Sequence, residues 1–218
     1  MKISYAITVC NELEEITNLL NLLLKRRRKT DEIVVLFDKK GGTPEVWSRL
    51  QELSDEKNCT IHSATFKNHF ADWKNKLTKL CTGDYIFQID ADEYPHETLI
   101  SHLPGILESN PDNEIYLVPR VNTVVGLTQN HINKWGWKVN EKGWVNWPDY
   151  QWRIWKNKPE IKWKNKVHEV LEGFKTYAPL PSIEGAALYH PKSIDRQEKQ
   201  NEYYNSIIKN YEDEKTKK

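Results

Sequence analysis

Residues 82–93 read TGDYIFQIDADE, and this stretch decides the fold. Gly83 interrupts a helical pattern, and Tyr85 to Ile89 form an apolar run typical of a buried strand. The run ends in Asp90 and Asp92, two carboxylates at positions i and i+2 that lie on the same side if the chain stays extended. Because ligands of open α/β sheets bind beyond the carboxyl ends of the strands, these acids predict a site at a strand end.

The residues before this stretch alternate between strand and helix patterns. Strands are expected at 3–9, 33–37 and 60–65, and helices at 13–23, 44–54 and 70–80, where apolar residues recur at steps of three and four. Asn11 followed by Glu14 resembles a capping box at the start of the first helix. Strands that alternate with helices form βαβ units, so a mainly parallel, Rossmann-like α/β sheet flanked by helices is predicted.

The second half of the chain has a different character. Strands are expected at 115–118, 151–155 and 167–171, and a C-terminal helix at 193–211. Seven of the nine Trp lie in one short stretch: Trp135, Trp137, Trp144, Trp147, Trp152, Trp155 and Trp163. We therefore expect one compact domain with two halves, a ligand-binding half at 1–120 and a Trp-rich annex with the C-terminal helix at 121–218.

Composition excludes several classes of protein. The chain has 218 residues, 29% charged and 38% hydrophobic, which fits one soluble globular domain. The net charge of +1 argues against a nucleic-acid binder. No apolar run reaches the ~20 residues of a membrane span. Three widely spaced Cys form neither a disulfide framework nor a zinc site, so a cytoplasmic location is expected.

The acids at the strand ends suit a metal bound to phosphate. Mg²⁺ and Mn²⁺ are held by one or two carboxylates together with substrate phosphates, and Asp90 and Asp92 could supply both. The alternative is a solvated acidic loop. Asp38 also follows an apolar strand and could accept a hydrogen bond from a base or ribose, or could be an ordinary turn residue.

Several segments together resemble glycosyltransferase family 2, which has the GT-A fold. The matching segments are TVCNE at 8–12, IVVLFD at 33–38, ADWKN at 71–75, TGDYIFQIDADE at 82–93, WPDYQWRIW at 147–155, VHE at 167–169 and YH at 189–190. The downstream segments resemble the short branch of the family that acts in lipopolysaccharide-core biosynthesis. The resemblance covers most of the chain and is more specific in the first half.

This resemblance implies a hexosyltransferase that moves a sugar from a nucleotide-diphosphate donor, most often a UDP-sugar, to an acceptor hydroxyl with inversion. The implied nucleotide-binding residues are Thr8, Cys10, Asn11, Glu12, Asp38, Trp73, Asp90 and Ala91. The implied ligands of a Mn²⁺ or Mg²⁺ cofactor are Asp90, Asp92 and His168. For His168, a core histidine bonded to backbone is the alternative.

An inverting transfer also needs a general base for the acceptor hydroxyl. Asp149 is the candidate that the resemblance favours, with Glu169 second. Asp149 could instead form a salt bridge with Arg153, four residues later.

The Trp-rich segment predicts where the acceptor binds. Indole rings stack on the apolar faces of sugars, although large aromatics also close small cores. We expect most of the seven to be packed and Trp135 and Trp137 to be exposed toward the acceptor, with Arg153 nearby. The neighbouring lysines would attract an anionic glycan or glycolipid, and contact with a membrane surface is compatible with this.

Two other functions compete with sugar transfer. A nucleotidyltransferase usually carries a Gly-rich basic loop after its first strand, whereas this loop reads CNELEE at 10–15. A non-catalytic carbohydrate-binding protein could use the Trp cluster but would not need acids at strand ends. The segment after Asp38, KKGGTP, departs from the family's acidic turn, and QWRIW lacks the spacing of processive synthases.

Overall fold

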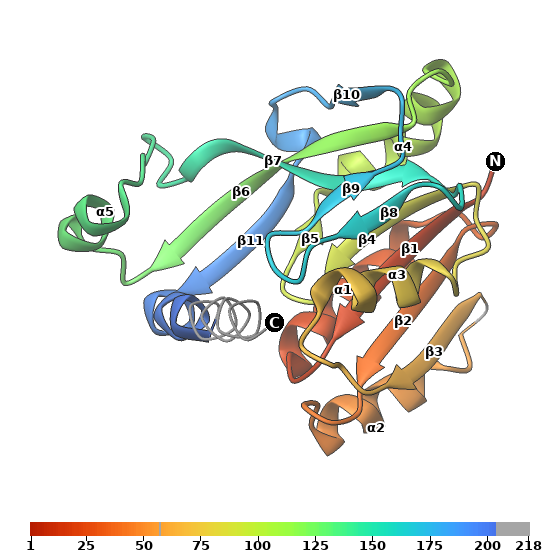
Figure 1. The fold of residues 1–218 in the computed structure, drawn as a ribbon, viewed down its shortest axis with the longest axis horizontal. Helices are drawn as coiled ribbons and strands as arrows, with labels where there is room; N and C mark the ends of the chain where they lie inside the picture. Colours follow the sequence, from red (N-terminus) through yellow and green to blue (C-terminus); the bar gives the residue numbers. More distant parts are fainter. Residues whose placement is uncertain (57, 204–218) are drawn as a thin grey trace, which may run out of the picture.

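The computed structural model describes residues 1–56 and 58–203, which form a three-layer α/β structure (Figure 1). Within these residues one sheet has nine strands, eight of them in the order β3-β2-β1-β4-β7-β6-β11-β5, while β10 also pairs with β6. The elements are β1 Ile3–Val9, α1 Leu13–Arg26, β2 Glu32–Asp38, α2 Pro44–Leu53, β3 Cys59–Ala64, α3 Phe70–Thr78, β4 Tyr85–Asp90, β5 Tyr94–Pro95, α4 Glu97–Ser109, β6 Ile115–Val125, α5 Gln129–Trp135, β7 Val145–Lys156, β8 Lys162–Lys164, β9 Val170–Glu172, β10 Tyr177–Pro179, the short 3₁₀ helix Glu184–Ala186, and β11 Leu188–Ser193.

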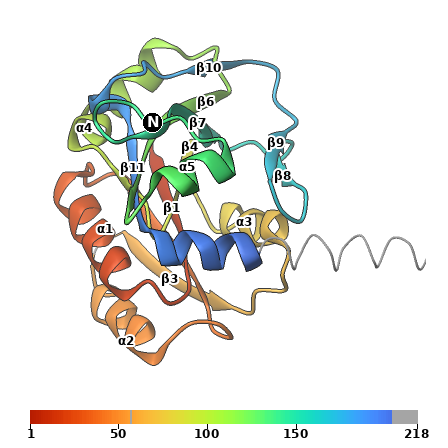
Figure 2. The ribbon, with the colours of Figure 1, turned by 90° about the vertical axis from the view of Figure 1, so that its left-hand side faces the viewer.

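The two faces of the sheet carry separate apolar cores. Along β1, Ile3, Tyr5 and Ile7 face α1, α2 and α4, whereas Ala6 faces α3 and the small β8–β9 sheet. This alternation follows from the two-residue repeat of a strand. Figure 2 shows α1, α2 and α4 on one side of the sheet and α3 with β8 and β9 on the other. The predicted α/β fold with a mainly parallel sheet is confirmed.

Strand register brings the predicted site residues to one edge of the sheet. β1 pairs in parallel with both β2 and β4, and Thr8 lies opposite Asp90. β4 then pairs antiparallel with β7, and in the adjoining β6–β7 pair Arg120 lies opposite Asp149. The carboxyl ends of β1, β2 and β4 therefore lie in the same sheet as the strand that carries the candidate base.

The second half differs from the sequence-based prediction in strand length. β6 and β7 form a long antiparallel hairpin, where shorter strands were expected. The hairpin ends in residues 126–144, here called the α5 arm, which protrude from the body (Figure 1). Residue 120, where the predicted division into two halves falls, lies inside β6. The division remains a prediction.

Several smaller expectations were wrong. The expected strand at 167–171 begins only at Val170, and α4 and α5 were not predicted. The expected capping box is absent because Glu12 is the N-cap of α1, without a side-chain cap bond. Its carboxylate instead accepts hydrogen bonds from the backbone N–H groups of Cys10 and Asn11. The C-terminal helix is described over residues 194–203, Ser193 belongs to β11 instead, and the predicted residues 204–211 lie outside the described residues.

Glu32, at the start of β2, couples stability to acid pH. Burial raises the pKa of Glu32, but hydrogen bonds from Lys2, Ser4 and Thr82 outweigh burial and lower it to about 2. A lowered pKa in the folded state stabilises the protein fully above the unfolded value near 4.5, and this contribution is lost as the pH falls from there toward 2. The shift corresponds to about 3 kcal/mol.

Glu32→Gln should therefore flatten the acid dependence of stability. Urea unfolding between pH 7 and pH 3 should show a large deficit for the variant at pH 7 that shrinks below pH ~4.5. An equal deficit at both ends of this range would show that Glu32 ionisation does not stabilise the fold.

Candidate active site

A cavity of about 1020 Å³ opens at the carboxyl edge of the sheet. β1, β2 and β4, the β6–β7 hairpin, the loop before β9, β11 and the C-terminal helix contribute to its wall. Of the predicted site residues, every one except Trp135 lines it: Thr8, Cys10, Asn11, Glu12, Asp38, Trp73, Asp90, Ala91, Asp92, Trp137, Asp149, Arg153, His168 and Glu169. The structure thus brings together residues that are up to 161 positions apart in the chain.

The ends of β1 and β2 supply a polar floor. The Thr8 hydroxyl donates to Asp90 Oδ1 at 3.4 Å. Both Asp38 oxygens accept backbone N–H groups, from Lys40, Gly41 and Phe66. Asp38 therefore links the loop after β2 to the loop after β3, and this structural role accounts for its burial beside the cavity.

Asp90 is held by a residue of its own strand, β4, and by one of the neighbouring strand β7. Its Oδ2 accepts from Arg153 Nη2 at 2.7 Å, and its Oδ1 also accepts from Gln88 at 3.1 Å. Burial raises the pKa of Asp90, but the positive charges of Arg153, Lys74 and Arg120 lower it well below its usual range. Asp90 is therefore an anion at neutral pH.

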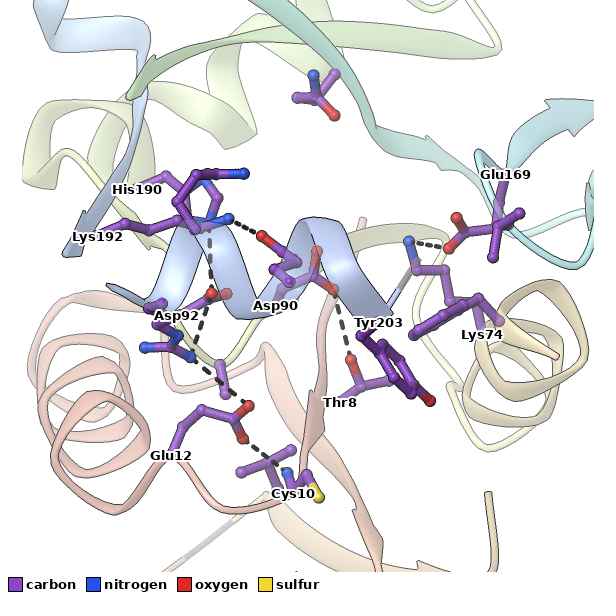
Figure 3. A pocket seen from close by; sticks show the side chains of 18 of the residues that line it. Thr8, Cys10, Glu12, Lys74, Asp90, Asp92, Glu169, His190, Lys192 and Tyr203 are labelled. Atoms are coloured by element: carbon purple, nitrogen blue, oxygen red, sulfur yellow. Dashed lines mark hydrogen bonds and ion pairs between the residues drawn. The ribbon is translucent and has the colours of Figure 1, made fainter. Parts of the chain in front are cut away.

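Asp92 faces a different set of cations (Figure 3). Its Oδ2 lies 3.3 Å from His190 Nε2 and 3.4 Å from a guanidinium nitrogen of Arg196. Burial raises the pKa of Asp92, and the hydrogen bond and charge of His190 together with Arg196 lower it to about 2. Both members of the acidic pair are thus ionised and point into the cavity.

The acidic pair fits a divalent cation only if other ligands come from a bound molecule. Among residues 1–56 and 58–203, no three His, Cys, Asp or Glu side chains are grouped closely enough to hold a metal. His168 lines the cavity but does not form such a group with Asp90 and Asp92, so the predicted three-ligand set is not preassembled. Two ionised carboxylates that share a cation with diphosphate oxygens match the usual Mg²⁺ arrangement.

The two carboxylate oxygens of Asp149, on β7, accept different numbers of hydrogen bonds. Its Oδ2 accepts from Arg120 Nε at 2.9 Å, Arg120 Nη2 at 2.7 Å and Asn122 Nδ2 at 2.8 Å. Its Oδ1 accepts only from Gln151, at 2.7 Å. Burial raises the pKa of Asp149, but Arg120, Asn122 and Gln151 outweigh burial and lower it. The ion pair of Asp149 is with Arg120, and not with Arg153, which was the alternative to its role as the base.

Arg153 lines the cavity with a largely buried side chain. It is 4% exposed and bonds to Asp90 and Glu93, each at 2.7 Å. This places its charge against the acidic pair, and a contact between Arg153 and the acceptor stays a prediction.

Glu169, the second candidate base, lies beside Lys74, across the cavity from His190 and Lys192 (Figure 3). It forms an ion pair with Lys74 Nζ at 2.8 Å, and Lys74 also lies 4.6 Å from the ring centre of Trp163. His168 beside it has a positive φ of 53°, an unusual backbone conformation for a non-glycine residue. Glu169 and Asp149 are therefore both ion-paired, each with a cation from another element.

Three of the seven clustered Trp pack in or against the core. Trp155 is 1% and Trp163 3% exposed, Trp152 packs against the same apolar cluster, and the other four are partly exposed. In the α5 arm, Trp135 stacks with His131 at 5.3 Å and contacts Trp137 at 4.6 Å. Trp137 lines the cavity and Trp135 only supports it.

The sequence reasoning missed several residues that shape the site. These are Glu93, Arg120, Asn122, His190 as the partner of Asp92, and Arg196. Glu93 stands inside the TGDYIFQIDADE stretch, so a signal was present. Arg120 and Asn122 were missed because the predicted strand ended at 118, and Arg196 was missed because helix packing is not visible in sequence.

Comparison with known proteins assigns this site to a family. The sequence pattern of the family described as "Glycosyl transferase family 2" matches residues 4–177. The chain therefore belongs to glycosyl transferase family 2, a class of enzymes. No curated protein matches the chain in sequence.

Solved structures confirm the fold. Residues 1–349 of S. aureus TarS superpose with a TM-score of 0.61 at 18% identity, over 88% of this chain and 60% of that one. The same fragment in complex with UDP-GlcNAc gives 0.60 at 17% identity, over 88% and 59%. The chain thus spans about 60% of the length of that fragment. Within the described residues, no helix is both long enough and apolar enough to cross a bilayer.

Proposed function

We propose that the chain transfers a sugar from a nucleoside diphosphate donor to a hydroxyl of a glycan or glycolipid, with inversion and with a divalent cation. The observation that carries this proposal is one cavity that holds the ionised pair Asp90 and Asp92 together with Asp149. UDP is the proposed nucleotide, since TarS residues 1–349 bind UDP-GlcNAc in a similar fold. A lipopolysaccharide-core type of acceptor is the finer proposal that the sequence resemblance supports.

The donor would occupy the side of the cavity formed by β1, β2 and β4. Thr8 to Glu12 and Trp73 offer backbone groups and an aromatic face for the nucleotide, and the cations Lys192 and Arg196 lie beside Asp92. Asp90 and Asp92 would hold Mn²⁺ or Mg²⁺, which supplies Lewis-acid stabilisation of the charge that develops on the leaving diphosphate. The carboxylates contribute by staying ionised over the whole neutral range.

Asp149 would remove the proton of the acceptor hydroxyl. The Oδ1 atom receives the proton, because Oδ2 already accepts three hydrogen bonds and Oδ1 accepts one. The acceptor oxygen then forms a bond with the anomeric carbon while the bond from that carbon to the diphosphate oxygen breaks. The leaving diphosphate keeps the electron pair of the broken bond, and one displacement inverts the anomeric centre.

The acceptor would enter past the α5 arm. Trp137, Val145 and Asn146 line this side of the cavity. Lys134 and Lys138 on the arm are exposed. An aromatic face flanked by cations suits a sugar that carries phosphate or carboxylate groups.

Trp137→Ala should weaken acceptor binding selectively. Loss of one stacking surface of about 1 kcal/mol should raise the acceptor KM roughly five- to tenfold and leave the donor KM unchanged. Steady-state kinetics with an acceptor that supports turnover would measure both constants. Trp144→Ala, in the same arm but away from the cavity lining, is the matched control. An unchanged acceptor KM would remove Trp137 from the acceptor site.

A thermal-shift screen of nucleotide sugars with and without Mn²⁺ tests the proposed function. A donor that binds the folded state at 100 times its Kd should add about 2.7 kcal/mol of stability, which is a readily measured rise in Tm. The rise should require Mn²⁺ and should be largest for one base. If no nucleoside diphosphate shifts the Tm in the presence of Mn²⁺, the proposal fails.

A further inference from the structure

Glu93 is the most deeply buried carboxylate at the site, and the proposed reaction does not use it. Its side chain has no exposure to solvent. Its Oε1 lies 2.9 Å from Arg120 Nη1 and 2.7 Å from Arg153 Nη2, while its Oε2 accepts the backbone N–H of Asp90 at 3.2 Å. A carboxylate is rarely buried so completely unless partners compensate its charge.

The two arginines connect Glu93 to both parts of the proposed site. Arg153 bonds to Asp90, the acid on the donor side, and Arg120 bonds to Asp149, the candidate base. The result is a continuous chain of ion pairs, Asp90–Arg153–Glu93–Arg120–Asp149, in which each link is between 2.7 and 2.9 Å. Glu93 is the central member and touches no open part of the cavity lining.

A second connection runs through neutral and aromatic groups. Asn122 donates its Nδ2 to Asp149, so its Oδ1 must accept from His190 Nδ1 at 2.9 Å. His190 Nε2 faces Asp92 at 3.3 Å. Both ring nitrogens of His190 therefore face oxygen atoms, one of Asn122 and one of Asp92. The base and the acidic pair are therefore joined along two routes.

We propose that Glu93 is a positioning residue, which holds Arg120 against Asp149 and Arg153 against Asp90 at the same time. The inference rests on the proposed function of the site. Arg120 pairs with both Glu93 and Asp149, so its positive charge is not directed at the base alone. Asp149 then stays ionised and is fixed by two parallel N–H groups of Arg120. It remains a stronger base than it would be if Arg120 paired with Asp149 alone.

Other charges around Asp149 must be considered in any test by pH. Arg120 on β6 bonds to it directly. Arg153 on β7 is connected to it through Glu93 and Arg120, and His190 on β11 is connected to it through Asn122. Lys192, also on β11, lies near Arg120. Of these charged groups, Arg120 is the one bonded directly to Asp149, and Glu93 is bonded directly to Arg120.

Glu93→Gln should lower kcat at least tenfold and shift the acidic limb of the kcat–pH profile to lower pH. Without the competing anion, Arg120 pairs with Asp149 alone and makes it a weaker base. Glu93→Asp, which keeps the charge on a shorter side chain, should restore part of the rate. Glu32→Gln is the matched control: it also removes a buried, ion-paired carboxylate but lies at the opposite end of the strands, and should leave kcat and its pH profile unchanged.

Arg120→Lys provides a second test that leaves the buried charges balanced. A lysine cannot donate two parallel N–H groups, so the acidic limb should move to higher pH, opposite to the shift in Glu93→Gln. If neither variant moves the acidic limb, or if Glu93→Gln lowers the Tm alone, Glu93 is only structural and the inference is overturned. If Asp149→Asn turns over like the wild type, the proposed base itself fails, whatever Glu93 does.

Discussion

Asp149→Asn is expected to abolish most sugar transfer while the folded protein still binds its donor. Loss of a general base typically costs a factor of about 10² to 10⁴, and kcat should fall by that amount. Asparagine has the same shape, and Arg120 keeps Glu93 as an anionic partner, so the cavity should remain intact. Steady-state kinetics would give kcat, and calorimetric titration of the nucleotide diphosphate with Mn²⁺ would show an affinity near that of the wild type.

Glu169→Gln is the matched comparison for this result. Glu169 lines the same cavity and is also ion-paired, but its partner Lys74 belongs to the opposite wall. We expect its kcat to fall much less than that of Asp149→Asn. A large loss for Glu169→Gln together with a nearly normal Asp149→Asn would assign the base to Glu169.

Asp92→Asn is expected to remove the dependence of donor binding on metal. The Asp92 carboxylate is ionised, since its pKa is lowered to about 2, and amide oxygens are weaker ligands for Mn²⁺. Transfer should fall by about a factor of 100 or more, because charge on the leaving diphosphate is no longer neutralised as well. The measurement is donor affinity and rate as a function of Mn²⁺ concentration.

An exposed aspartate gives the control for Asp92→Asn. Asp72 on α3 has a side chain that is 77% exposed, and Asp72→Asn should respond to Mn²⁺ as the wild type does. If Asp92→Asn keeps the same half-saturating Mn²⁺ concentration as the wild type, Asp92 does not hold the metal. His190 and Arg196 would then be the groups that neutralise Asp92 throughout the reaction.

The sequence predicted the parts of the fold that depend on local patterns. Strand β1 alternates loosely and is β-prone, β2 and β4 are largely apolar, and α1 and α3 repeat at helical spacing, so their type and order were evident. The candidate acids followed directly, because carboxyl ends of parallel strands meet at one edge. Their collection around one cavity was thus predictable from order alone.

The parts that could not be predicted depend on pairing between distant residues. Arg120 was not recognised because strand β6 continues to Val125, and its length is fixed by pairing with β7 rather than by its own sequence. The partners of Asp149 and Arg153 also lie on other strands: Asp149 pairs with Arg120 on β6, and Arg153 pairs with Asp90 on β4. The irregular register between β6 and β7 depends on both strands and is not visible in either one alone.

The anomeric configuration of the first product tests the account most directly. With a donor identified by its Mn²⁺-dependent thermal shift, proton NMR can follow the anomeric signal as the sugar moves to an acceptor hydroxyl. A glycosidic product does not mutarotate, so its configuration is preserved. We predict a single displacement with Asp149 as the base, and therefore only the inverted anomer. A product that retains the donor's configuration would contradict it.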